Sequence, residues 1–489
     1  MKPLHEVVYV GHSNLIFPIF PIKPHVALQW IIMQNDFSSL IQVILDRHAR
    51  WRASWPEFSC DPSLEIDETT MHGVLEELHA RLLDNYPFFH PLYAGQMLKP
   101  PHAAAVLGYV SAMLINPNNH ALDGGPATGA MEKEVVAELA EMFGYDEHLG
   151  HLTSGGTVAN LEALWVSRAL HPDKAIAFSD QSHYTHRRMC EVLGVRSVEV
   201  SSDDSGKMDV DALKHLCLSE NIGTVVVTMG STALGALDPL TALFELRERL
   251  GFRVHIDAAY GGFFRLIADG SPRGVNRELF EAMPAADSIV VDPHKHGLQP
   301  YGCGCILFRD PSVGRFYKHD SPYTYFTSND LHLGEISLEC SRPGASAAAL
   351  WTTLRVLPLL PDTGLGAVLR RCREAALAFA DMLRVSQRLF LLLEPELDIV
   401  TYFPGTRPFC STTVSAASHR IFTEAMADSQ HRLYISKLRV SSRLVAARYP
   451  DFAADHEWTT VLRSALMKPE HADWVRSILE RLEHVAAAE

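Results

Sequence analysis

Short apolar runs rich in β-branched residues alternate with segments of helical periodicity through the middle of the chain. The runs lie at Ala175–Phe178, Ser197–Val200, Thr224–Thr228, Arg253–Ile256 and Ser288–Val291. Strands that alternate with helices predict an α/β fold, in which right-handed crossovers build a mostly parallel sheet with helices on both faces. Ligands in such folds bind beyond the carboxyl ends of the strands. Chemically unusual residues at those ends are therefore candidates for a functional site.

Helical patterns dominate the rest of the chain. Apolar residues at helical spacing predict helices over Met71–Leu83, Met131–Phe143 and Thr363–Leu389. The run Leu397–Phe403 predicts a further strand, and the chain is expected to close with a helix over Ala472–Ala487. The last part of the chain is therefore expected to mix helices with a smaller sheet.

Composition narrows the class of protein. The 489 residues, 47% hydrophobic and 21% charged, are typical of a globular protein with a large core. A formal net charge of −15 argues against nucleic-acid and anionic-membrane partners, because both need a basic surface. The apolar stretch Leu15–Ile22 contains two prolines and is too short to span a bilayer.

The eight cysteines follow no disulfide or metal pattern. Cys303 and Cys305 form the only close pair, and their spacing differs from that of zinc and thioredoxin motifs. Small buried thiols are the favoured interpretation. We therefore expect no metal and a reduced, cytoplasmic setting.

Lys295 occupies an unusual position for a charged side chain. It lies between His294 and His296, directly after the apolar run Ser288–Val291. A lysine that is partly desolvated and near other cations is less strongly protonated, so its amine becomes a nucleophile toward a carbonyl group. The alternative is an exposed loop lysine, as most lysines are.

Three more strand ends carry candidate chemistry. The segment HLTSGGTVANLEAL, residues 151–164, places a glycine pair before a helix, whose free N–H groups and dipole would hold a phosphate. The alternative is an ordinary helix cap. His183 follows the strand that ends at Phe178, where a histidine is more often structural. Asp257 needs a cationic partner or several donors to stay ionised at the end of an apolar strand, unless it only caps a helix.

Five motifs connect these strand ends. They are, in order, TSGGTVANLEAL, SDQSHYT, TMGSTALGALDP, HIDAAYGG and DPHKH. Together they resemble the group II pyridoxal-phosphate-dependent amino-acid decarboxylases, among them the archaeal-type tyrosine and aspartate decarboxylases, to which the sphingosine-phosphate lyases are related. The resemblance covers about residues 85–360.

The resemblance implies the aminotransferase-like fold type I of PLP-dependent transferases and a homodimer with the active site at its interface. A large PLP-binding domain would span residues 106–355. An N-terminal extension and helical segment at 1–105 would precede it, and a smaller C-terminal α+β domain at 356–489 would follow. Pyridoxal 5′-phosphate is the implied cofactor, and a small amino acid is the implied substrate.

The resemblance also assigns catalytic roles. Lys295 would hold the cofactor as an internal aldimine and exchange it for the amine of the substrate. Asp257 would keep the pyridine nitrogen protonated, so that the ring accepts the electrons released at Cα, and its own pKa would fall. His183 would stack on the ring, and Ala259 would pack against the other face. His296 departs from the tryptophan or methionine expected after the lysine, so substrate identity does not transfer directly.

Further positions match contacts with the rest of the cofactor. The phosphate end is matched by Gly156, Thr157 and His294, with Ser154 and Gly155 beside them. Positions that contact the cofactor or support such contacts are matched by Thr232, Asp238 and Asp292. The protein must also hold the Cα–carboxylate bond perpendicular to the ring, so that CO2 leaves rather than the α-proton.

The outcome of the reaction is expected to depend on the segment HDSPYTYF at residues 319–326. Relatives carry here a mobile loop whose tyrosine protonates Cα, and Tyr323 or Tyr325 would be that general acid. The alternative is an aromatic loop that only packs. If neither tyrosine reaches Cα, an oxygen-consuming decarboxylation that forms an aldehyde becomes the alternative outcome.

Three residues are candidate substrate contacts. His90 and Tyr93 lie in an aromatic, proline-broken segment at 85–97, which would line a pocket or pack on a neighbour. Arg342, in a segment that resembles one of the archaeal-type decarboxylases, would clamp a substrate carboxylate or form a buried ion pair. Arg342 favours an acidic substrate, whereas Tyr93, Phe326 and the loop tyrosines favour an aromatic one, so the substrate stays open.

We therefore expect a PLP-dependent carboxy-lyase that converts an L-amino acid into the corresponding amine and CO2. A carbon–carbon lyase of the sphingosine-phosphate-lyase type is an alternative that needs a basic phosphate pocket near the substrate. A transaminase would return the proton to C4′ of the cofactor. A non-catalytic PLP-binding scaffold is disfavoured, because it has no need of both Lys295 and Asp257.

Overall fold

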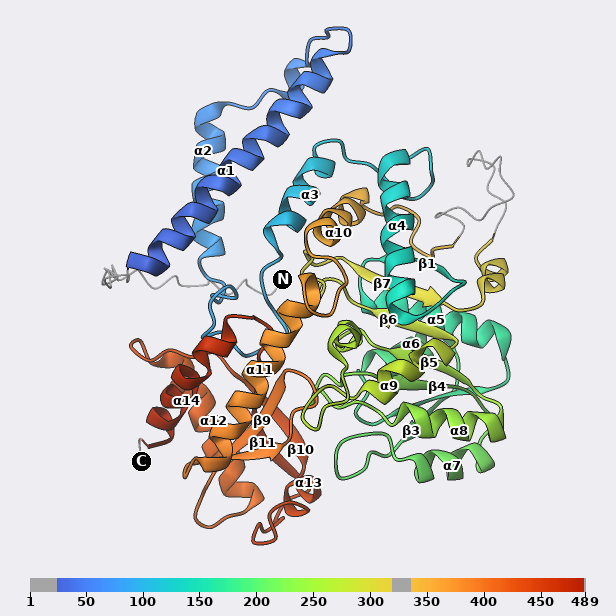
Figure 1. Cartoon of the computed structure of the whole chain (residues 1–489), viewed down its shortest axis with the longest axis vertical. Coiled ribbons are helices and arrows are strands. Elements are labelled where there is room, and N and C mark those ends of the chain that lie inside the picture. The colour runs from blue at the N-terminus through green and yellow to red at the C-terminus, as the bar shows by residue number, and fades with distance from the viewer. Residues whose placement is uncertain (1–23, 319–335, 488–489) are drawn as a thin grey trace, which may run out of the picture. The chain divides into compact units, whose positions relative to one another are not determined.

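A computed structural model describes residues 24–318 and 336–487, with side chains from residue 37 onward (Figure 1). The chain divides into two compact units between Phe58 and Ser59. The first unit contains helix α1 (Pro24–Ala53), and the second contains the other described elements. None of the described helices is long and apolar enough to cross a membrane.

The central sheet has seven strands and is mostly parallel. Its strands are β1 (Leu149–Thr153), β2 (Ala175–Ser179), β3 (Ser197–Val200), β4 (Ile222–Thr228), β5 (Arg253–Asp257), β6 (Ser288–Val291) and β7 (Gly304–Phe308). Their order is β1-β7-β6-β5-β4-β2-β3, and β7 pairs antiparallel with both β1 and β6 while the remaining pairs are parallel. The five predicted runs correspond to β2 through β6, which confirms the α/β class.

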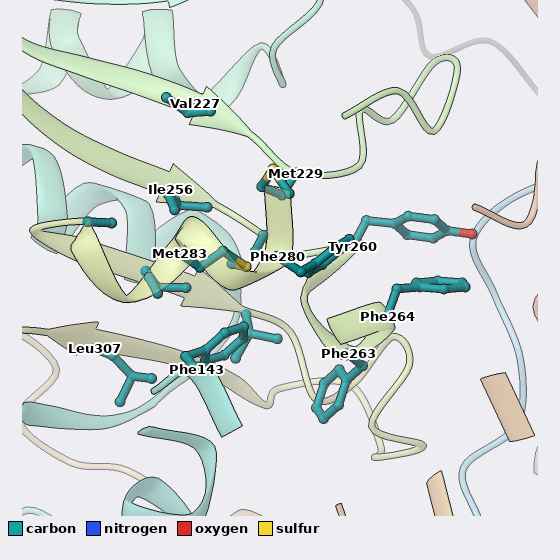
Figure 2. Packing of buried hydrophobic residues seen from close by; sticks show 14 of the residues in the cluster. Phe143, Val227, Met229, Ile256, Tyr260, Phe263, Phe264, Phe280, Met283 and Leu307 are labelled. Atoms are coloured by element: carbon teal, nitrogen blue, oxygen red, sulfur yellow. The ribbon is translucent and has the colours of Figure 1, made fainter. Parts of the chain in front are cut away.

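Burial on both faces explains the continuous apolar runs. Every residue of β2, β4 and β6 is buried, as in strands that helices cover on both sides. The core brings together Phe143, Ile256, Phe280 and Leu307 from four separate elements (Figure 2). The predicted helix over Met131–Phe143 lies within α4, which ends where Gly144 adopts the left-handed conformation, with φ 80°.

The remaining elements of this part of the chain connect and flank the strands. The α-helices are α3 (Ala103–Met113), α4 (Pro126–Phe143), α5 (Gly156–Leu170), α6 (Thr185–Leu193), α7 (Val210–Ser219), α8 (Leu240–Leu250), α9 (Arg277–Ala282) and α10 (Gly344–Val356). The short 3-10 helices are η1 (Pro62–Leu64), η2 (Gly262–Ile267), η3 (Met283–Ala285) and η4 (Pro311–Phe316).

A second, antiparallel sheet, the C-terminal sheet, follows. Its strands are β8 (Leu389–Leu393), β9 (Ile399–Pro404), β10 (Ser436–Ser441) and β11 (Trp458–Ala465), in the order β10-β11-β9-β8. Its helices are α11 (Gly364–Val385), α12 (Ser411–Ala427), α13 (Ser442–Ala446) and α14 (His471–Ala487). The strand predicted over Leu397–Phe403 and the closing helix are confirmed. The domain boundaries at residues 105 and 355 stay a prediction.

The helix predicted over Thr363–Leu389 is too long at its C-terminal end. Helix α11 stops at Val385, and Leu389 already begins β8. Ser386 takes an extended conformation, with ψ 141°, and its hydroxyl accepts the N–H groups of Arg388 and Leu389. These hydrogen bonds to the Ser386 side chain take the place of the backbone hydrogen bonds that a further helical turn would make.

Helix α2 (Glu68–Leu82) contains most of the helix predicted over Met71–Leu83. The carboxylate of Asp67 caps it by accepting the N–H of Thr70 at 2.7 Å. None of its residues is buried, although several are large and apolar. The segment 85–97 is irregular, as its prolines predict.

Candidate active site

A cavity of about 350 Å³ lies at the carboxyl ends of the central strands. All of the predicted cofactor contacts except Asp238 line it, namely Ser154, Gly155, Gly156, Thr157, His183, Thr232, Asp257, Ala259, Asp292, His294 and Lys295. They come from the segments that follow β1, β2, β4, β5 and β6. The fold therefore gathers at one edge of the sheet residues that are spread over more than a hundred positions in the sequence.

Lys295 is held inside this cavity. Its Nζ lies 3.0 Å from Oδ2 of Asp292, and its backbone N–H donates to the carbonyl of Asp292, which closes the turn after β6. The Lys295 side chain is only 20% exposed, and that of Asp292 is 4% exposed. The alternative of an ordinary solvated loop lysine is therefore wrong.

The first turn of α5 forms one wall of the cavity. Gly155 precedes it with φ 148° and ψ 171°, a conformation that is essentially restricted to glycine, and offers no side chain to cap the helix. A Cβ on Gly156 would lie 2.8 Å from Oδ2 of Asp292, so that a side chain has no room there. The N-terminus of α5 thus faces the cavity with the hydroxyls of Ser154 and Thr157 beside it. This donor set suits a phosphate group.

His294 lies next to this helix terminus as a neutral ring. Its Nδ1 donates to the carbonyl of Cys303 at 2.8 Å, and its Nε2 is 3.5 Å from Oδ2 of Asp292. Burial lowers the pKa of His294, although the charge of Asp292 opposes the shift. With Nδ1 occupied, Nε2 is the nitrogen that remains for a ligand.

Asp257 is a buried carboxylate with strong partners. Its Oδ2 accepts the Nε2–H of His186 at 2.9 Å, and its Oδ1 accepts the backbone N–H of Ala259 at 3.1 Å. Burial alone would raise the pKa of Asp257, but the bond from His186, the charge of Lys295 and the N–H of Ala259 outweigh it and hold the pKa below its ordinary value. The carboxylate therefore stays ionised, as a partner of a protonated pyridine nitrogen must.

His186 is a functional neighbour that the sequence reasoning missed. Its side chain is fully buried at the start of α6, and its Nδ1 has no hydrogen-bond partner among the described residues. Because a carboxylate oxygen only accepts, the ring carries a proton on Nε2. The only signal in the sequence was its position one helical turn after His183.

His255 stabilises the elements next to the cavity through two buried contacts. Its Nε2 donates to Oδ1 of Asn160 at 2.8 Å, and its Nδ1 lies 2.8 Å from the hydroxyl of Ser288. Burial lowers the pKa of His255 to about 3, so the ring is neutral at physiological pH. This network connects α5, β5 and β6 next to the cavity, which Asn160 helps to line.

His183 and Ala259 both line the cavity, as the stacking roles require. The Nδ1 of His183 forms a hydrogen bond with the hydroxyl of Thr185, which fixes the ring. Burial lowers the pKa of His183, and Lys295 adds to the shift while Asp257 opposes it. A neutral ring is the better stacking partner for a protonated pyridine.

Thr232 and Asp238 divide into a cavity residue and a supporting residue. Thr232 is exposed in the loop after β4 and lines the cavity. Asp238 is buried, and its carboxylate accepts the N–H groups of Met208 and Thr228 at 2.8 Å each. Burial raises the pKa of Asp238 to about 6. Its place is under the loop, not in the cavity.

Arg342 does not line the cavity, and its contacts favour the alternative of a buried ion pair over a substrate clamp. Its guanidinium lies 2.6 Å from Oε1 of Glu132 and also donates to the carbonyls of Leu152 and Asn119. Both side chains are almost fully buried. Both terminal nitrogens of the guanidinium are therefore engaged within the protein, as expected for the buried ion pair that the sequence left open.

His90 and Tyr93 lie outside the set of residues that line the cavity. The ring of His90 packs against Trp474 at 5.1 Å, and its Nδ1 accepts the N–H of Leu92. Tyr93 is buried beside Tyr434, with the ammonium of Lys468 5.3 Å from its ring. Their role in substrate binding has no support within one chain. Tyr323, Tyr325 and Phe326 lie outside the described residues.

A larger hollow elsewhere carries none of the predicted chemistry. It measures about 800 Å³ and lies around Arg273, Arg384 and Glu394. These charges are paired at the surface, Arg273 with Asp381 and Arg384 with Glu394. The cavity around Lys295 is therefore the candidate active site.

The residues around this cavity fit pyridoxal phosphate. A lysine amine, an ionised buried carboxylate and an uncapped helix N-terminus surround a space of about 350 Å³. These groups match an aldehyde, a pyridine nitrogen and a phosphate. Comparison with known proteins points the same way, since the family model described as the pyridoxal-dependent decarboxylase conserved domain matches residues 59–403.

Curated relatives and solved structures extend the comparison. An L-tyrosine decarboxylase of Enterococcus faecium is 28% identical, with 71% of this chain and 74% of the relative covered. A probable L-tyrosine/L-aspartate decarboxylase of Methanothermobacter thermautotrophicus is 32% identical, with 63% of this chain and 82% of the relative covered. The crystal structure of Oryza sativa TDC with PLP and tryptamine matches with a TM-score of 0.73 at 18% identity, covering 96% of this chain and 99% of that one, which supports the fold.

Proposed function

The chain belongs to the pyridoxal-dependent decarboxylase family, and from this premise we propose that it converts an L-amino acid into the corresponding amine and CO2. The observation that carries the proposal is that one cavity contains both Lys295 and a buried, ionised Asp257. When bound, pyridoxal phosphate supplies the electron sink for the bond that breaks at Cα. The protein supplies binding, orientation and proton positions.

Lys295 would bind the cofactor through its amine. In the structure Nζ of Lys295 lies 3.0 Å from Oδ2 of Asp292. Once the substrate amine has replaced it, the amine of Lys295 remains in the cavity and can hold a proton close to Cα.

Asp257 and the start of α5 would fix the two ends of the cofactor. The carboxylate of Asp257 would keep a proton on the pyridine nitrogen, with the bond from His186 holding it in place. The N–H groups of Gly156 and Thr157 would bind the phosphate. With both ends held, the orientation of the Cα–carboxylate bond relative to the ring is left to the substrate contacts.

Tyr323 or Tyr325 would donate the proton that Cα takes up after CO2 leaves. This proposal rests on the resemblance alone, because both residues lie outside the described part of the chain. Without such a donor, oxygen-consuming aldehyde formation is the expected outcome. The ratio of amine to aldehyde in the products therefore reports on this loop.

An aromatic L-amino acid is the substrate that we propose first. The argument for an acidic substrate rested on Arg342, whose guanidinium is bound by Glu132. Among the described residues that line the cavity, Lys295 is the only lysine or arginine. The E. faecium relative is named an L-tyrosine decarboxylase. The same lack of basic residues gives no support to a lyase that acts on a phosphorylated substrate.

A homodimer in a reducing, cytoplasmic setting completes the proposal. Helix α2 has no buried residue, yet Val74, Leu75, Leu78 and Leu82 are each about half exposed along one face. A second copy of the chain would cover this face. All eight cysteines are free thiols, which suits a reducing compartment.

Incubation of the PLP-loaded protein with pooled L-amino acids tests the function. Release of an amine together with CO2 would support the decarboxylase and name its substrate, while an aldehyde with oxygen uptake would support the alternative outcome. Lys295→Ala is expected to lose the visible absorbance of the bound cofactor and turnover together, because it removes the amine that binds the aldehyde. Normal turnover in this variant would contradict the mechanism.

A further inference from the structure

His296, the residue after the proposed cofactor lysine, faces the carboxylate of Asp398, which lies directly before β9 of the C-terminal sheet. Its Nε2 lies 3.3 Å from Oδ2 of Asp398, and neither side chain has any exposed surface. Oδ1 of the same carboxylate accepts the hydroxyl of Tyr260 at 2.5 Å. The histidine that was unexpected in the sequence is thus part of a buried group of three, which we call the Asp398 cluster.

The Asp398 cluster adjoins the cavity at two points. His296 follows Lys295, and Tyr260 follows Ala259, so that one carboxylate contacts the neighbours of two proposed cofactor contacts. The ring of His296 packs edge-on against Tyr260 at 4.9 Å and against Phe264 at 5.0 Å. In Figure 2 the hydroxyl of Tyr260 points away from the strands that carry Val227 and Ile256.

Asp398 itself is held firmly by the C-terminal part of the chain. Its carbonyl accepts the N–H of Leu466, next to the end of β11. The guanidinium of Arg373 on α11 donates to the carbonyls of Pro395 and Leu397, at 2.7 and 2.8 Å, directly before it. The carboxylate is therefore a fixed point against which the cavity segments can be placed.

The environment of the pair favours an uncharged imidazole ring beside the carboxyl group of Asp398. Burial raises the pKa of Asp398 to about 6 and lowers the pKa of His296 well below its ordinary value. Nε2 of His296 and Oδ2 of Asp398 lie 3.3 Å apart, and neither atom has a hydrogen-bond partner among the described residues. Because buried polar atoms are rarely left unpaired, each is the nearest candidate partner of the other. The positive charges of the partly buried Lys99 and of Arg373 oppose the effect of burial and lower the pKa of Asp398.

We propose that Asp398 is a positioning residue that sets the placement of Lys295 and Ala259 through hydrogen bonds with His296 and Tyr260. The inference rests on the proposed function, because it concerns the binding of pyridoxal phosphate. It makes the C-terminal sheet part of the cofactor site, although none of its residues lines the cavity. Loss of the cluster should therefore weaken cofactor binding and not only stability.

The test measures the dissociation constant of pyridoxal phosphate for purified apo-protein by absorbance titration. Asp398→Leu and His296→Leu are each expected to raise it at least about tenfold, because each leaves a buried partner unpaired. The double variant should be no weaker than the weaker single variant, since the two changes break one interaction. Additive losses, or a constant within about twofold of wild type in a folded Asp398→Leu protein, would overturn the proposal.

Two further variants separate positioning from general stability. Asp398→Asn keeps an acceptor for Tyr260 and offers an amide donor to Nε2 of His296, so it should bind the cofactor within about threefold of wild type. An asparagine variant as weak as the leucine variant would overturn the hydrogen-bonded arrangement. Tyr402→Phe, on the strand β9 that begins directly after Asp398, loses a buried bond to Ser464 and should lower the melting temperature with cofactor affinity unchanged.

A further variant keeps the test decisive if Asp398→Leu does not fold. If Asp398→Leu does not fold, Tyr260→Phe retains the ring and loses only the hydroxyl, and it should weaken cofactor binding at least about fivefold. Unchanged affinity in that variant would overturn the proposal. Wild-type protein that does not bind pyridoxal phosphate at all would instead contradict the proposed function, so the two failures are distinguishable.

Discussion

Asp257 illustrates how single side chains set the chemistry of the cavity. Its carboxylate is buried, which on its own favours the neutral acid, yet its pKa lies below the ordinary value. His186 provides the largest of the opposing influences, through its hydrogen bond first, and the charge of Lys295 contributes less. A histidine outside the cavity lining thus holds the carboxylate in the form that a cofactor nitrogen needs.

Removal of this hydrogen bond should weaken both cofactor binding and turnover. His186→Phe fills a similar volume without a donor, and a hydrogen bond to a charged group contributes about 1.5 to 3 kcal/mol. We expect kcat/KM to fall by about one to two orders of magnitude, and the pH dependence of the absorbance of the bound cofactor to shift. His186→Gln, which can still donate to Asp257, should recover most of the loss. Equal activity of the two variants would show that His186 only packs.

Buried pairs between elements were beyond the reach of the sequence. Apolar runs predicted β2 to β6, because strands buried on both faces carry an uninterrupted pattern. β1 was not among those runs, since Gly150 and His151 interrupt its apolar residues. The glycine pair before α5 was found, but the partner of Arg342 was not, because Glu132 lies 210 positions away. A charged residue shows its type in the sequence and its partner only in the fold.

Arg342 and Glu132 link the segment before α10 to α4, and their separation should reduce stability. Arg342→Met leaves Glu132 buried without its cation, and breaking a buried ion pair typically costs about 3 to 5 kcal/mol. We expect a clear fall in the melting temperature of apo-protein, with KM little changed in the protein that remains folded. Arg342→Met combined with Glu132→Gln should recover part of the stability. A large rise in KM without loss of stability would restore Arg342 as a substrate contact.

The network of His255 should make the elements behind the cavity sensitive to acid. The folded protein lowers the pKa of His255 from 6.5 to about 3, so below pH 6.5 the unfolded chain binds the proton more readily and stability is lost as the pH falls toward 3. The full loss from this residue is about 5 kcal/mol. Urea unfolding at several pH values should show a flatter profile for His255→Gln, which keeps both hydrogen bonds. An equally steep profile would contradict the assignment.

At the scale of the whole molecule, the two sheets have different roles at the candidate active site. The seven-stranded sheet builds the cavity, and the C-terminal sheet supports it through Asp398. Most residues that line the cavity could be predicted because they lie at or after strand ends in recognisable motifs. The predicted substrate contacts His90 and Tyr93 do not reach the cavity. Substrate recognition is therefore the part of the function that the motifs left open.

Helix α2 provides the test of the proposed dimer. Leu75 and Leu78 are 50% and 48% exposed, and burial of a leucine contributes about 1.5 to 3 kcal/mol. Because a twofold interface uses each residue twice, Leu75→Glu with Leu78→Glu would place four charges in it. We expect light scattering to show a dimer for the wild type and a monomer for this variant.

The exposure of α2 within one chain makes this outcome interpretable. No residue of the helix is buried within one chain, so the two changes should leave the circular dichroism of the folded protomer unchanged. Glu76→Gln, on the same helix between the two leucines, is the matched control and should remain a dimer. A variant that still forms dimers would place the interface elsewhere, and a monomeric wild type would contradict the dimer itself. Loss of turnover on dissociation would mean that the second chain completes the active site.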